Sequence, residues 1–115
     1  MANTFKTITK ANVTSADVIY TVAGSTTTVL LGILLGNTTG SAITATVSLG
    51  SDTANRAGNN DEANQTVELI TGTSIPANSS LELLTGNKVV METTDNLQVT
   101  GSASTDVVLS IMEIT

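Results

Sequence analysis

An alternation of apolar and polar residues with a period of two is the feature that most limits how this chain can fold. From Ile43 to Leu49, every second residue is aliphatic and the residues between them are Thr or Ser. Successive side chains of a β-strand point to opposite faces, so the segment is predicted to be a half-buried strand with its apolar face inward. The same period recurs along the chain, and no stretch keeps a helical period.

Nine segments are predicted as strands because turns rich in Gly, Asn, Ser and Pro separate them. They are Thr7–Val13, Asp17–Val22, Thr26–Leu35, Ile43–Leu49, Gln65–Ser74, Ser80–Leu84, Lys88–Glu92, Leu97–Thr100 and Val107–Ile114. Strands spaced roughly 8–12 residues apart are typical of a sandwich or a barrel. We therefore expect an all-β fold, a two-sheet antiparallel β-sandwich of eight or nine strands with jelly-roll or immunoglobulin-like topology.

The length of 115 residues is enough for one domain. We expect residues 1–115 to form a single β-sandwich, with residues 1–10 as a candidate N-terminal arm and residues 50–64 as a long polar loop. The loop lacks apolar periodicity, and loops of this length are often functional or mobile. The alternation predicts six core residues: Leu30, Leu34, Val47, Leu83, Val89 and Leu109.

Composition argues against the common kinds of catalytic and metal site. The chain has no Cys and no His, which excludes disulfides, thiolate metal sites and a Ser–His–Asp triad. The polar loop offers oxygen ligands of the kind calcium takes, although their spacing differs from an EF-hand. These are Asp52, Asn55, Asn59, Asn60, Asp61 and Glu62. We expect no enzyme, no catalytic residue, no cofactor and no metal, and calcium binding by the loop stays an open alternative.

Charge and aromatic content bear on the class of partner. Four basic residues stand against ten acidic ones, for a net charge of −6, so a phosphate-binding patch is not expected. The same balance disfavours an anionic membrane surface. Phe5 and Tyr20 are the only aromatic residues, which leaves no stacking platform for nucleic acid. We expect no transmembrane segment, because the longest apolar run is Val29–Leu35. We also expect no secretory signal, because residues 1–6 contain no apolar stretch.

This apolar run is the most informative segment. Its aliphatic residues fall on both faces of the predicted strand: Val29, Leu30, Leu31, Ile33, Leu34 and Leu35. Either the domain itself covers both faces, or one face meets a neighbouring subunit. A two-layer sandwich has one dry layer, which favours a partner, so these residues are the candidate subunit interface. Gly32 in mid-strand indicates a bulge or a close approach by another backbone.

The order of strand and turn segments also carries a resemblance. The segments are Ile19–Gly24, Leu35–Ser41, Ile43–Leu49, Ser74–Leu84, Gly86–Glu92 and Asp106–Ser110. With them the chain resembles a family of small virion structural proteins of tailed phages, especially phages of marine and cyanobacterial hosts. The resemblance covers roughly residues 4–115. The family usually has a proline in the turn where this chain reads Ala23-Gly24, a difference that concerns the turn geometry.

The resemblance implies a non-enzymatic β-sandwich component of a virion assembled in the host cytoplasm. We favour a capsid decoration or cement protein that binds and stabilises the assembled head. The alternative is a tail, neck, baseplate or fibre-attachment accessory protein. A carbohydrate-binding module ranks behind both, because such sites usually offer aromatic platforms. The partners would be the major capsid protein, or tail and neck proteins of the same virion, together with further copies of this chain.

Overall fold

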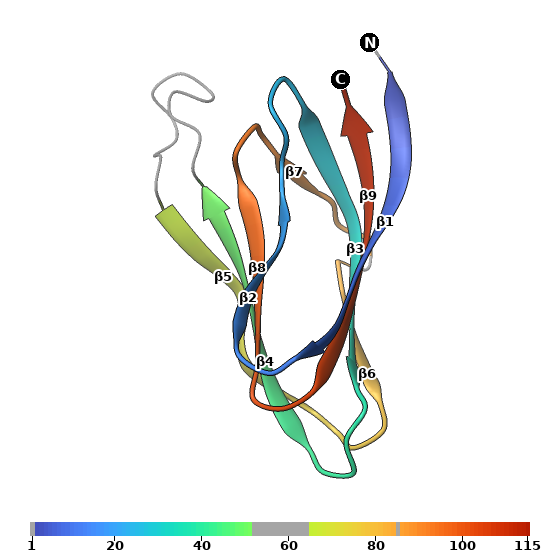
Figure 1. Cartoon of the computed structure of the whole chain (residues 1–115), viewed down its shortest axis with the longest axis vertical. Helices are drawn as coiled ribbons and strands as arrows, with labels where there is room; N and C mark the ends of the chain where they lie inside the picture. The colour runs from blue at the N-terminus through green and yellow to red at the C-terminus, as the bar shows by residue number, and fades with distance from the viewer. Residues whose placement is uncertain (1, 52–64, 85) are drawn as a thin grey trace.

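The computed structural model describes residues 2–51, 65–84 and 86–115. These residues form nine β-strands and no helix (Figure 1). The strands are β1 (Asn3–Val13), β2 (Ala16–Thr21), β3 (Thr27–Asn37), β4 (Ile43–Ser51), β5 (Gln65–Ile75), β6 (Ser80–Leu83), β7 (Val89–Met91), β8 (Asn96–Gly101) and β9 (Thr105–Ile114). Each coincides with one of the predicted segments, and the largest shift of a boundary is at the start of β1.

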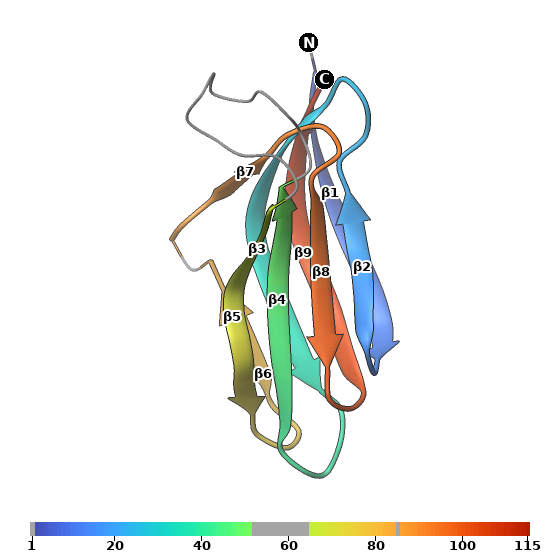
Figure 2. The same cartoon turned by 90° about the vertical axis from the view of Figure 1, so that its left-hand side faces the viewer.

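The strands form two antiparallel sheets that face each other (Figure 2). Sheet A has the order β1-β9-β3-β6, and β7 also pairs with β3. Sheet B has the order β2-β8-β4-β5. This is the order of a jelly roll in which β6 and β7 share one strand position beside β3. The predicted β-sandwich is confirmed, and the strand order is the jelly roll rather than the immunoglobulin-like alternative.

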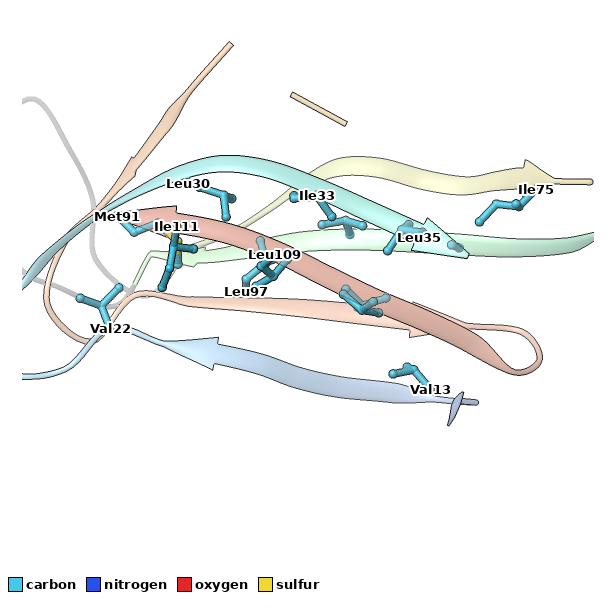
Figure 3. Packing of buried hydrophobic residues seen from close by; sticks show 14 of the residues in the cluster. Val13, Val22, Leu30, Ile33, Leu35, Ile75, Met91, Leu97, Leu109 and Ile111 are labelled. Atoms are coloured by element: carbon cyan, nitrogen blue, oxygen red, sulfur yellow. The ribbon is translucent and has the colours of Figure 1, made fainter. Parts of the chain in front are cut away.

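The core lies between the two sheets and is aliphatic. Leu30 and Leu109 of sheet A and Val47 and Leu97 of sheet B are each 0% exposed. Figure 3 shows the labelled members of this cluster in the layer between the sheets. Burial of Leu30, Val47 and Leu109 therefore agrees with the alternation in the sequence.

Two other predicted core residues are partly buried, and one faces the other way. Leu83 and Val89 pack against the core from the short strands β6 and β7. The prediction for Leu34 is wrong, because its side chain is 37% exposed. The register between β3 and β9 shifts between Leu30 and Gly32, which inserts one extra residue. A bulge of this kind reverses the phase of the alternation beyond it, so the side chain of Leu34 points outward.

The bulge also explains the glycine in the middle of β3. A Cβ atom added to Gly32 would meet no atom within 4 Å, so no neighbouring backbone needs the space. Of the two reasons expected for this glycine, the bulge is the one that the structure contains.

Asn37, the last residue of β3, ties together one end of the sandwich. Its side chain is 2% exposed. Its Nδ2 donates hydrogen bonds to the carbonyl oxygens of Ser41, Ile75 and Pro76 at 2.8, 3.0 and 3.0 Å. Its Oδ1 accepts hydrogen bonds from the backbone N and the hydroxyl of Thr39 at 2.9 and 2.7 Å. One side chain thus joins the β3–β4 connection to the end of β5.

The candidate N-terminal arm is, from Asn3 onward, part of β1, which pairs with β9 along its length. It is therefore an edge strand of sheet A. Of the predicted polar loop, Gly50 and Ser51 belong to β4, and residues 52–64 lie outside the described residues.

Candidate interaction surface

The outer face of sheet A, which is turned away from the core, carries a row of apolar side chains from four strands. The register places Phe5 of β1 opposite Met112 of β9, Met112 opposite Val29 of β3, and Val29 opposite Val90 of β7. Residues directly opposite each other point to the same face, so the four side chains form one ridge across the sheet. Phe5 is 71% exposed and Val90 is 59% exposed, so both ends of the ridge are open to solvent.

A second row runs beside this ridge, toward the β6 end of the sheet. It contains Thr9 of β1, Val108 of β9, Leu34 of β3 and Glu82 of β6, which lie opposite one another in that order. The middle of the row is aliphatic, and the exposed carboxylate of Glu82 lies at its edge. The second row therefore pairs an apolar centre with a charged rim.

The sheet is hollowed between the two rows because small residues lie there. Thr7, Ser110 and Gly32 are opposite one another across β1, β9 and β3. Leu31, at the bulge, lines two hollows, one of about 410 Å³ beside Leu83 and one of about 260 Å³ toward β1. Side chains of two facing sheets interdigitate, so two rows with a trough between them form a surface that another sheet can pack against.

The charged groups near the ridge are held together on its inner side. The hydroxyl of Tyr20 donates to Glu113 Oε2 at 2.6 Å and lies 2.7 Å from Thr28 Oγ1. Lys6 Nζ lies 2.7 Å from Glu113 Oε1. These contacts join β2 of sheet B to β1, β3 and β9 of sheet A. Lys6, which follows Phe5 in the chain, thus has its charge paired with Glu113.

The same contacts shift two pKa values. Burial, followed by the hydrogen bond to Glu113, raises the pKa of Tyr20 to about 12. The hydrogen bonds from Lys6 and then from Tyr20 lower the pKa of Glu113 from its ordinary 4.5. The neutral phenol and the ionised carboxylate are therefore the forms that this cluster stabilises.

The structure divides the six predicted interface residues between the two faces of β3. Leu30, Ile33 and Leu35 are 0%, 2% and 0% exposed in the core, so the domain itself covers them and they are removed from the candidate surface. Val29, Leu31 and Leu34 belong to the outer face. Contact between that face and another subunit stays a prediction.

Sequence reasoning missed four apolar members of the outer face, on three other strands: Phe5, Val90, Val108 and Met112. The sequence contains a signal for two of them. β7 and β9 each contain two adjacent valines, Val89-Val90 and Val107-Val108, and adjacent residues of a strand point to opposite faces, so one valine of each pair faces outward. Phe5 lies in the segment predicted to be an arm, so the alternation assigns it no face. The valines alone do not show that these residues meet on one face, because that depends on strand order.

Other kinds of site can be described for part of the chain. Within residues 2–51, 65–84 and 86–115, no three His, Cys, Asp or Glu side chains gather as the ligands of a metal ion would. The residues considered for calcium, in 52–62, lie outside the described part. Among the described residues, no helix has the length and apolar character required to cross a bilayer.

A hollow of about 390 Å³ on sheet B differs in character from those on sheet A. Its lining includes the amide side chains of Gln65, Asn96 and Gln98, together with Val18. It is therefore a mainly polar depression, while the outer face of sheet A is mainly apolar.

No protein-family model and no curated protein matches the sequence. Among solved structures, the chain is similar to one from the disulfide-linked pili of Bacillus endospore appendages, with 16% identity and a TM-score of 0.47 over 99% of this chain and 87% of that one. It is also similar to one from the T13 IBDV viral particle, with 13% identity and a TM-score of 0.28 over 98% of this chain and 39% of that one.

Proposed function

We propose that the protein is a non-enzymatic structural subunit of a bacteriophage virion, and that it binds the assembled particle through the outer face of sheet A. The observation that supports this most is the apolar ridge from Phe5 to Val90 beside a hollowed trough. An apolar patch of this kind is an aggregation liability on a free monomer and an asset once it is covered.

Within the virion, we propose the role of a capsid decoration or cement protein, with the major capsid protein as its partner. A domain of 115 residues can offer only a modest contact area. Many copies on a symmetric lattice hold one another in place, because a link between neighbours raises the effective concentration of each. The acidic net charge of −6 would oppose non-specific aggregation of the protein before it reaches the particle.

Antibody labelling of purified particles, viewed by electron microscopy, tests this proposal. A decoration protein gives label over the whole head, and quantitative mass spectrometry then finds a copy number in proportion to the capsid lattice. Label confined to the tail, neck or baseplate supports the alternative role as an accessory protein there. Particles that carry no label contradict both virion roles.

A carbohydrate-binding role is the remaining alternative, and the polar hollow on sheet B is the place where it would be sought. Its amide side chains can hydrogen-bond to sugar hydroxyls, but the ring of Tyr20 is not among its lining residues. A glycan array separates this role from the structural one. Specific binding that is lost in Gln98→Ala would favour the carbohydrate role over the structural proposal.

A further inference from the structure

The outer edge of sheet A has the features of a strand-pairing surface. β1 is the last strand of the sheet beside β9, and no described strand pairs with its other edge (Figure 1). Ala2 and Thr115 exchange both backbone hydrogen bonds, at 3.2 and 3.0 Å, and the same register continues as far as Lys10. Hydrogen-bonded and non-hydrogen-bonded pairs alternate in an antiparallel ladder, so every second residue after Ala2 also bonds to β9.

The residues between them turn their backbone groups the other way. Asn3, Phe5, Thr7 and Thr9 thus present their N–H and C=O groups to the free edge of β1. Their side chains share the outer face with the ridge. A row of free backbone groups beside an exposed aromatic side chain is a template on which another strand can pair.

The other edges of the described sheets are interrupted. On the far side of sheet A the edge is divided between β6 and β7, of four and three residues. In sheet B, the register of β2 shifts between Val18 and Tyr20. The register of β5 shifts twice, and the backbone of Gly72 has a φ of 55°. Bulges and short strands protect sheet edges from pairing, and β1 has neither from Asn3 to Lys10.

We propose that two copies of the chain pair β1 against β1 in antiparallel fashion, about a two-fold axis at Phe5. The five-stranded sheet A of each copy then continues into a ten-stranded sheet. Phe5 faces Phe5 of the second copy, and Asn3 faces Thr7. This arrangement makes about six backbone hydrogen bonds, two for each of the three facing pairs.

The choice of register follows from the side chains of β1. An axis at Lys6 would place two lysines directly opposite each other, which destabilises a sheet. An axis at Thr7 would leave Phe5 beside Thr9, with its ring still uncovered. The axis at Phe5 forms an aromatic pair and places Lys6 opposite Thr4. It also makes the two apolar ridges continuous, which accounts for a phenylalanine that is 71% exposed in the single copy.

A second copy fits this edge because the edge is complementary to itself. An isologous contact needs the same residues to meet from both sides, and β1 provides an equal set of donors and acceptors to each copy. Lys6 and Lys10 are engaged within the chain, at 2.7 Å from Glu113 and 3.6 Å from Asp17, so neither lysine is needed by the partner.

Disulfide trapping tests the register, because the chain has no cysteine of its own. When Asn3→Cys and Thr7→Cys are mixed, the two substituted positions face each other with their Cα atoms about 5.5 Å apart, within the range that a disulfide spans, and Phe5 is retained. In the matched control, Thr7→Cys alone, the two Cα atoms would lie about 14 Å apart, four residues out of register. We expect mild oxidation to give a covalent dimer in the mixture and not with Thr7→Cys alone. A covalent dimer of Thr7→Cys alone, or no covalent dimer in the mixture, overturns the proposal.

Sedimentation of the purified protein tests the pairing itself, without any virion. The untagged chain should approach twice its mass of 11.7 kDa as the concentration rises. Thr7→Pro removes an N–H that faces the free edge and should shift the protein to monomer while its circular dichroism is unchanged. Thr9→Pro removes a similar N–H beyond the paired segment and should remain dimeric. A wild type that stays monomeric, or a Thr7→Pro that stays dimeric, overturns the proposal, and neither result bears on the virion role.

Discussion

Alanine substitution of two adjacent leucines of β3 tests whether the bulge sets the phase of the strand. Leu35 is 0% exposed and Leu34 is 37% exposed. Removing the side chain of Leu35 loses its transfer free energy and leaves a cavity between the sheets, so the free energy of unfolding should fall by about 2–5 kcal/mol. Burying a whole leucine side chain contributes ~1.5–3 kcal/mol, and roughly two-thirds of Leu34 is buried. Leu34→Ala should therefore lower the free energy of unfolding by at most about 1–2 kcal/mol.

Urea denaturation measures the difference. With a slope of about 2 kcal/mol per molar urea, the midpoint should fall by ~1–2.5 M for Leu35→Ala and by less than ~1 M for Leu34→Ala. Leu109→Ala, at another side chain that is 0% exposed, serves as a core reference. If Leu34→Ala lowers the urea midpoint as much as Leu35→Ala does, the bulge does not turn the side chain of Leu34 outward, and Leu34 does not belong to the outer face of sheet A.

Three further predictions concern the polar contacts. The chain has one Tyr and no Trp, so the absorbance of tyrosinate reports on Tyr20 alone, and its titration midpoint should lie near 12 rather than at the ordinary 10.0. The protein should lose stability as the pH rises between these two values. Glu113→Gln should lower the titration midpoint of Tyr20, because Glu113 helps to raise it. Because the pKa of Glu113 is lowered from 4.5, its contribution to stability should be complete above pH 4.5 and decline below it, so thermal denaturation in acid should affect the wild type more than Glu113→Gln. Asn37→Ala removes the buried amide donor to the carbonyl of Ile75 and should lower the free energy of unfolding by about 1–3 kcal/mol in the same urea assay. An unchanged midpoint would contradict the role given to that amide.

The number and placement of strands could be predicted from the sequence because alternation and turn residues are local signals. The segment from Ile43 to Leu49 shows this, since its alternation agrees with the burial of Ile43, Ala45 and Val47 at 5%, 1% and 0%. Bulges break this correspondence. An extra residue at Leu31 changes the phase of β3, and its position depends on the partner strand β9 as well as on the sequence of β3.

The outer face of sheet A could be predicted only in part for the same reason. The apolar run of β3 showed that one strand has two apolar faces. That Phe5 and Met112 join it follows from the pairing of the two terminal strands, more than 100 residues apart in the chain. Residues this distant are brought together by strand order, which no local pattern in the sequence contains. The cluster of Lys6, Tyr20 and Glu113 was missed because it depends on the same pairing.

Binding of purified variants to particles assembled without this chain is the most direct test of the central claim, that the outer face of sheet A contacts the virion. Val90→Asp places a charge on the ridge at a side chain that is 59% exposed. Val67→Asp is its matched control, the same change at a side chain of sheet B that is 53% exposed. Both variants should fold, because neither valine lies in the core. We predict that Val90→Asp no longer sediments with the particles and that Val67→Asp binds as the wild type does. Full binding by Val90→Asp, or equal loss in both variants, would contradict the claim.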